Sequence, residues 1–160
     1  MVEEPLIVEE VCTEGGDWSR TVCALEELID TVPCISSRLL AAIAGVDQRV
    51  ASRVLARRAE RYGFRRVGST VYCSCRGSWD AIPEPRNRSR ITEADLARIA
   101  IAYTMVCRRG TVEDAAAVLT VLARKLGVHV ANPRRSIIRV LSKLDWAGLD
   151  TGGRLAPVTT

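Results

Sequence analysis

The sequence of 160 residues has few aromatic side chains, only 4% of the total, and almost no lysine or histidine. Just two of its 23 basic residues are lysine, and His129 is its single histidine. The apolar residues, which make up 48% of the chain, are therefore mainly Ala, Val, Leu and Ile. Such side chains favour closely packed helices over a large β-sandwich.

Long apolar runs are also missing. No uninterrupted stretch approaches the roughly 18 residues that a membrane span needs. The opening residues 1–5 lack the basic and apolar regions with which a signal peptide begins. We therefore expect a cytoplasmic protein that has no membrane partner.

Motifs typical of enzymes and metal sites do not occur. The sequence has no phosphate-binding loop, no G-x-S-x-G and no paired carboxylates that would line a catalytic pocket. No C-x-x-C is present, and one histidine does not complete a conventional zinc ligand set. We expect no catalytic residues, no cofactor and no metal, and we interpret His129 as structural.

Cysteine is abundant, with six residues at positions 12, 23, 34, 73, 75 and 107. Cys23 and Cys107 fall at apolar positions of helical patterns, which indicates small buried thiols. Cys73 and Cys75 alternate along a predicted strand, so they face the same way and would not easily bridge each other. Disulfides between other pairs of these cysteines would require an oxidising compartment, which is unusual for a cytoplasmic protein, or a hyperthermophilic source. The sequence leaves open whether any cysteines pair.

The charge is unevenly distributed along the chain. Residues 1–30 hold nine acids and one base, whereas residues 31–91 hold twelve bases and four acids. Residues 92–160 hold ten bases and six acids. An acidic head followed by a basic body is typical of a protein that meets a polyanion on one face.

The spacing of apolar residues predicts helices between clear start and stop signals. Residues 1–18 form an acidic extension, either an edge strand or a loose tail, and a helical pattern begins at Ser19 and stops at Pro33. A second helix, residues 37–44, follows the N-cap Ser36 and ends at Gly45. A third helix runs from the cap Asp47 to about Tyr62. A hairpin around a Gly-Ser turn completes this unit.

The order helix, helix, tight glycine turn, helix, hairpin in residues 19–76 resembles the winged helix-turn-helix superfamily. The specific part is residues 36–50, in which small Ala41 precedes the turn residue Gly45 by four positions and apolar Val46 follows. The stretch 59–68 is similar to the exit of the family's recognition helix into its wing. The resemblance covers about a third of the chain, and it implies a mainly α fold with small β-hairpin wings.

The remaining sequence reads as a linker and a second helical domain. Residues 77–91 are rich in Pro and Arg and indicate a solvated spacer, with a basic arm on nucleic acid as the alternative. Residues 92–160 repeat the order of three helices and a short hairpin, with caps at Thr92, Thr111 and Asn132. This predicts a tandem winged helix, although a plain helical cap or a dimerisation element remains an alternative.

Basic and polar side chains on the third helix and the wing are the candidate DNA contacts. A recognition helix enters the major groove, where Arg and Gln read base edges. The predicted nucleic-acid-binding residues are Arg38, Gln48, Arg49, Ser52, Arg53, Arg57, Arg65 and Arg66 in the first half and Arg134, Arg135, Arg139 and Lys143 in the second. Only two acids lie among the nine bases between positions 38 and 76, whereas a merely solvated face mixes both signs.

These observations predict a DNA-binding protein, specifically a transcriptional regulator that acts on double-stranded DNA. A homodimer, or a protein partner bound through the acidic N-terminal region, is a further expectation. Two alternatives use the same surfaces. One is a winged-helix adaptor in a transcription, replication or ribosomal assembly, and the other is a binder of structured RNA.

Overall fold

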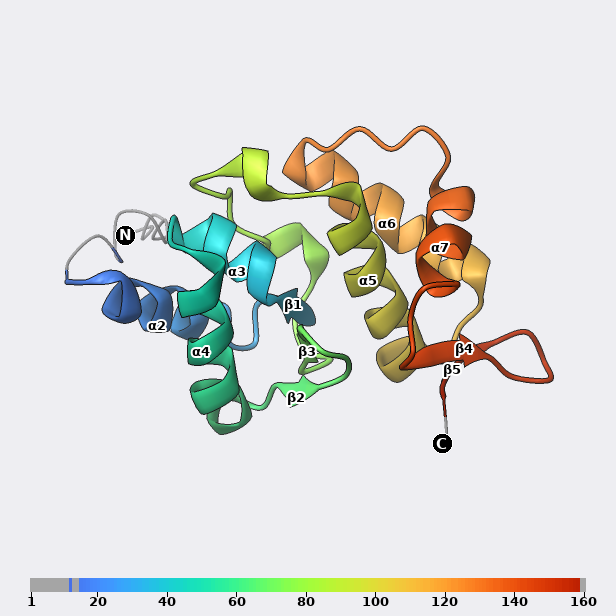
Figure 1. The fold of residues 1–160 in the computed structure, drawn as a ribbon, viewed down its shortest axis with the longest axis horizontal. Helices are drawn as coiled ribbons and strands as arrows, with labels where there is room; N and C mark the ends of the chain where they lie inside the picture. Colours follow the sequence, from blue (N-terminus) through green and yellow to red (C-terminus); the bar gives the residue numbers. More distant parts are fainter. Residues whose placement is uncertain (1–11, 13–14, 159–160) are drawn as a thin grey trace, which may run out of the picture.

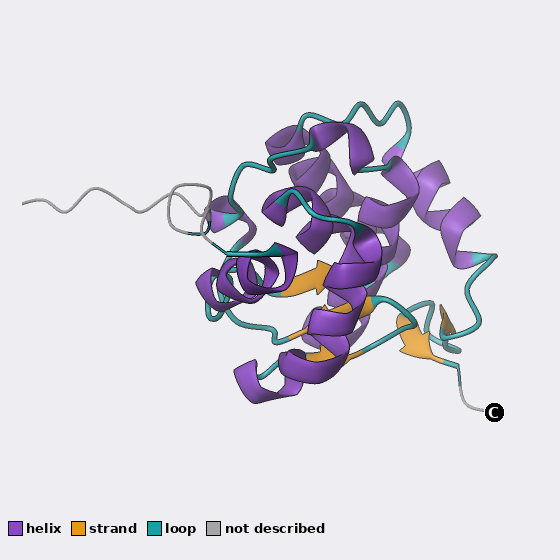
Figure 2. Ribbon diagram, turned by 60° about the vertical axis from the view of Figure 1, so that its left-hand side comes forward, coloured by secondary structure: helices purple, strands orange, loops and turns teal. Residues whose placement is uncertain are grey.

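The computed structural model describes Cys12 and residues 15–158. Over these residues the chain is mainly helical and carries small antiparallel sheets (Figures 1 and 2). Most of the predicted acidic extension, residues 1–11 and 13–14, lies outside the described residues. So does most of the acidic region expected to contact a partner. The last two residues of the predicted extension, Asp17 and Trp18, already belong to the first described helix.

Three helices and a three-stranded sheet make up the first half as far as the structure describes it, from residue 15 onward. In chain order they are α2 (Asp17–Glu27), β1 (Cys34–Ser36), α3 (Ser37–Ala44), α4 (Gln48–Arg58), the 3-10 turn η1 (Ala59–Tyr62), β2 (Arg65–Arg66) and β3 (Val71–Cys73). The strands pair antiparallel in the order β1-β3-β2. Ser36 lies opposite Val71, and Arg66 lies opposite Tyr72.

The second half repeats much of this order after two 3-10 turns, η2 (Trp79–Ala81) and η3 (Arg88–Arg90). Its elements are α5 (Glu93–Tyr103), the π-helical turn η4 (Thr104–Arg108), α6 (Val112–Leu126), α7 (Pro133–Leu141), β4 (Ala147–Leu149) and β5 (Leu155–Pro157). β4 and β5 pair antiparallel. Thr111, directly before α6, forms an isolated antiparallel bridge to Arg154.

Helix ends follow the signals in the sequence. The predicted helix 37–44 is confirmed: Ser36 Oγ accepts a hydrogen bond from the Leu39 amide at 3.0 Å, and Gly45 takes the left-handed φ of +70°. Such a φ costs a residue without Cβ very little. The third helix is α-helical only to Arg58 and narrows into η1 before Gly63, which has a φ of +84°. The predicted caps Thr111 and Asn132 also accept amide hydrogen bonds.

Strand β1 is an element that the sequence reading missed. Residues 34–36 are too few to show an alternating pattern, and they run directly into the cap of α3. The strand is defined by its partner β3, some 35 residues further on. Cys73 ends β3, and Cys75 lies beyond it with a φ of +59°. The expectation that Cys73 and Cys75 share one strand is therefore wrong.

The expectation of free buried thiols is also wrong. Cys23 and Cys107 are only half-buried, and both are bonded. The disulfides join Cys12 to Cys23, Cys34 to Cys73, and Cys75 to Cys107. Cys73 and Cys75 do not bridge each other, as predicted. The third disulfide ties the first half to the second.

The two halves share one core. Buried residues of α5 pack against β1 and β3. The Ser36 hydroxyl donates a 2.7 Å hydrogen bond to the carboxyl of Asp95 in the first turn of α5. From the other end of the chain, the indole of Trp146 covers Gly68 in the turn between β2 and β3. The halves are thus joined by apolar packing, a buried hydrogen bond and a disulfide.

Residues 77–91 are largely exposed, as their composition indicates, but the segment is also held against the folded protein at three points. Trp79 is buried and meets the Tyr103 ring edge-on, with 5.2 Å between ring centroids. The Asn87 amide donates to the Ala42 carbonyl at 3.0 Å, and the Arg90 guanidinium donates to the Val46 carbonyl at 2.5 Å. The linker is therefore held against α5 by Trp79, against α3 by Asn87 and against the α3–α4 turn by Arg90.

Candidate nucleic-acid interface

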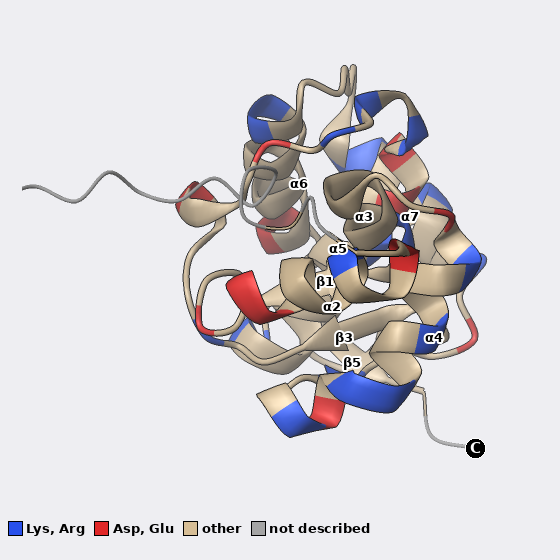
Figure 3. Ribbon diagram, turned by 90° about the vertical axis from the view of Figure 1, so that its left-hand side faces the viewer, with Lys and Arg blue, Asp and Glu red and all other residues tan. Residues whose placement is uncertain are grey.

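Helix α4 buries one side and exposes arginines on the other. Ala51, Val54 and Leu55 face the core. Arg49 and Arg53 are exposed one turn apart, and neither guanidinium has a hydrogen-bond or ion-pair partner among the described residues. Figure 3 shows basic positions recurring along this helix. The arrangement leaves two cations free to meet an external anion.

The other predicted residues of α4 are less free. The guanidinium of Arg57 lies over the Trp18 ring, 5.4 Å from its centroid, so Arg57 also packs α4 against α2. Gln48 and Ser52 are half-buried, and the Gln48 amide donates to Ser37 Oγ at 3.3 Å. Base reading by Gln48 would require this hydrogen bond to be given up.

Arg38 and the wing arginines make contacts within the protein. Arg38 is half-buried, and its guanidinium lies 3.5 Å from the Arg90 carbonyl. Arg66 donates to the carbonyls of Gly68 and Ser69 at 3.0 and 2.9 Å, which folds it back over its own turn. Arg65 is exposed beside a cavity of about 860 Å³. Trp146 covers the turn, so the tip of the wing is only partly accessible.

In the second half the predicted residues lie on and after α7, away from α4 (Figure 1). Arg134 pairs with Glu113 on α6 at 3.0 Å, and this hydrogen bond lowers the pKa of the exposed Glu113 carboxyl. Arg139 and Lys143 line a cavity of about 420 Å³. Arg135 is exposed in the first turn of α7. The predicted contacts thus form two groups, one in each half.

Sequence reasoning missed the residues that become neighbours only through the fold. Arg98 lines the smaller cavity with Arg139 and Lys143, although it is some 40 residues away from them in the chain. Arg76 lines the larger cavity with Arg65 and Arg66, and Pro157 of the second half closes its far side. No local pattern signals these groupings.

One buried carboxyl, that of Asp95, lies near two of these arginines, Arg98 and Arg38. Asp95 is almost fully buried, and removal from water raises its pKa, while the hydrogen bond from Ser36 and the nearby Arg98 and Arg38 partly counteract that rise. Its place at the junction of the halves gives it a structural role there.

Among the described residues, no helix is both long and apolar enough to cross a lipid bilayer.

A comparison of the chain with family models, curated proteins and solved structures finds no match.

Proposed function

We propose that residues 19–76 form a winged helix-turn-helix that binds duplex DNA through α4, and that the protein is a transcriptional regulator. The observation that carries this proposal is the pair of exposed, unpartnered arginines on α4, Arg49 and Arg53. Arginine supplies both phosphate contacts and bidentate contacts to guanine. Only one acid, Asp47, lies at this end of the helix, and it is occupied as the N-cap.

Topology supports the proposal. The order of the helices α2, α3 and α4 followed by the hairpin of β2 and β3 matches the order that carries the resemblance, and β1 adds a third strand beside β3. Ala41 is buried where α3 meets α4, and left-handed Gly45 makes the tight turn between them. A helix held in this way presents its exposed side to a major groove.

A second winged helix in residues 92–160 is part of the proposal. The bridge between Thr111 and Arg154 stands directly before α6, as the pairing of Ser36 with Val71 stands directly before α3. Both junctions place a hydroxyl N-cap at the start of the next helix. By this correspondence α7 matches α4. The connection from α6 to α7 is longer than the α3–α4 turn, so the two copies differ most there.

The test compares two double variants in binding to random-sequence duplex DNA across a salt series. Arg49→Ala/Arg53→Ala removes the exposed pair but spares Arg57, which packs on Trp18. We expect affinity to fall by about fivefold or more per arginine, since each good contact contributes about 1–3 kcal/mol. The matched control, Arg124→Ala/Lys125→Ala, removes two charges from the exposed end of α6.

If both double variants weaken binding equally, the interaction is a general charge effect and the α4 site is wrong. If the native chain does not bind even at low salt, DNA binding is wrong and a protein partner becomes the explanation. The same series on duplex RNA distinguishes the groove geometries. Tighter binding to RNA would contradict docking of α4 in a B-form major groove.

A further inference from the structure

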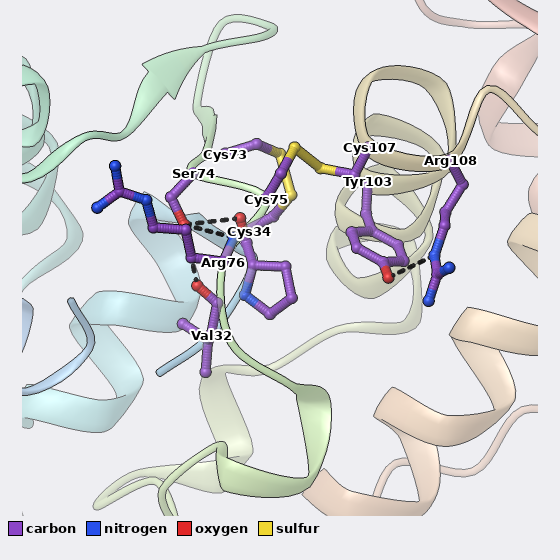
Figure 4. The surroundings of a disulfide bond; sticks show 10 residues. Val32, Cys34, Cys73, Ser74, Cys75, Arg76, Tyr103, Cys107 and Arg108 are labelled. Atoms are coloured by element: carbon purple, nitrogen blue, oxygen red, sulfur yellow. Dashed lines mark hydrogen bonds between the residues drawn. A yellow bond between two sulfur atoms is a disulfide. The ribbon is translucent and has the colours of Figure 1, made fainter. Parts of the chain in front are cut away.

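Four of the six cysteines converge where the two halves meet. They come from β1 (Cys34), the end of β3 (Cys73), the segment just after it (Cys75) and η4 (Cys107). The Sγ atoms of Cys34, Cys73 and Cys107 all lie within 4.8 Å of one another, and Cys75 is bonded to Cys107. Figure 4 shows the sulfurs gathered between the sheet and the π-helical turn.

The size of this cluster suits a single tetrahedral metal ion. Zinc bound by thiolates has Zn–S distances of about 2.3 Å, which places neighbouring sulfurs about 3.8 Å apart. The backbone positions also suit this, because Cys34 and Cys73 face each other across the sheet with Cα atoms 4.0 Å apart. Reduction of the two disulfides frees all four sulfurs: those of Cys34, Cys73 and Cys107 are already close, and the side chain of Cys75 must turn toward them to complete the tetrahedron.

The surroundings favour thiolates over neutral thiols. Cys34 and Cys73 are buried and Cys107 is half-buried, whereas Cys75 is exposed and gives a metal ion a route inward. The large cavity beside Cys73 and Cys75 is lined by Arg65, Arg66 and Arg76. Guanidinium groups beside a thiolate stabilise it. Of these three arginines, Arg65 is the one whose exposed side chain makes no bond among the described residues, since Arg66 bonds its own turn and Arg76 pairs with Asp30 at 3.0 Å.

We propose that in the reduced protein Cys34, Cys73, Cys75 and Cys107 bind one zinc ion that joins the two halves. Each disulfide takes two electrons and two protons from a dithiol reductant, which leaves as its own disulfide. Binding of Zn²⁺ then displaces the four thiol protons. No local pattern in the sequence indicates this site, because the four ligands lie in three segments far apart along the chain and the closest pair has the spacing C-x-C.

The test adds Co²⁺, as a probe for zinc, to the reduced full-length chain without oxygen. We expect one equivalent to give the intense visible and thiolate-to-metal absorption of a tetrahedral thiolate site, and Zn²⁺ to displace it. Cys75→Ser is the variant of choice because Cys75 is the exposed ligand and its replacement disturbs packing least. Because one of the four ligands is lost, the affinity for Co²⁺ should fall at least about 100-fold. The matched control is Cys23→Ser, which removes one thiol outside the cluster, from the pair that forms the Cys12–Cys23 disulfide in the oxidised protein.

Melting temperature provides a second readout. Zn²⁺ should raise the melting temperature of the reduced protein and leave that of the oxidised protein unchanged, because the disulfides occupy the ligands. Three results would overturn the proposal: no thiolate absorption from a reduced chain, an equal loss of affinity in both variants, or a reduced chain that is unfolded with or without zinc. If the protein is brown and contains sulfide when it is purified, the proposal is also overturned, because the four cysteines would then hold an iron–sulfur cluster and not zinc.

Discussion

At the scale of single residues, the fold changes the ionisation of Asp95 by burying its carboxyl. Its raised pKa means that the folded protein holds a proton more tightly than the unfolded chain does. At pH values between the ordinary aspartate pKa of 3.8 and the raised pKa in the folded protein, the folded state therefore binds more protons than the unfolded chain. The contribution of Asp95 to stability is greatest at low pH and falls as the pH rises through that window.

Asp95→Asn should remove this dependence. The amide oxygen can still accept the hydrogen bond from Ser36, and no charge is buried at neutral pH. We expect a flatter stability profile than that of the native protein, measured as urea midpoints between about pH 4 and 7. Asp145→Asn, on an exposed carboxyl, is the control. An unchanged slope in Asp95→Asn would show that the carboxyl titrates as it does in the unfolded chain.

At the scale of elements, the sequence predicted those whose signals are local. The signals for the helix 37–44 and for the caps Thr111 and Asn132 come from neighbouring residues in the chain. The predicted positions of these features agree with the observed ones. Strand β1 was missed because its partner is β3, far along the chain. The candidate site divides in the same way. The exposure of Arg49 followed from helical spacing, but the covering of the wing by Trp146 did not.

The N-cap of α3 should matter more than an ordinary cap. Ser36 Oγ accepts from the Leu39 amide and also donates to buried Asp95. Ser36→Ala therefore loses a cap, about 1 kcal/mol, and leaves a buried carboxyl with one partner fewer, about 1–3 kcal/mol more. Thr111→Ala, which removes the cap of α6, should cost only about 1 kcal/mol. Equal losses in urea denaturation would contradict the role of the Asp95 bond.

At the scale of the whole molecule, contact between the halves depends on close packing at the wing. A Cβ on Gly68 would lie 2.5 Å from the indole of Trp146, while the backbone there does not require glycine. Gly68→Ala should therefore destabilise the protein by about 1–3 kcal/mol through overpacking alone. Gly152→Ala, with only loose contact to Asp150, is the matched control. Chemical denaturation measures both, and a neutral Gly68→Ala would mean that Trp146 moves aside freely.

Because residues 77–91 are held against the protein, the orientation of α4 relative to α7 is fixed, and this limits how both helices can fit the grooves of one DNA duplex. Trp79, Asn87 and Arg90 hold this segment at three points, so it cannot act as a swivel between α4 and α7. If both helices contact one duplex, their angular separation around its axis is set by the protein. Each base pair inserted between the two contacts rotates one of them by about 35°. The duplex, and not the polypeptide, would then have to absorb the mismatch by twisting.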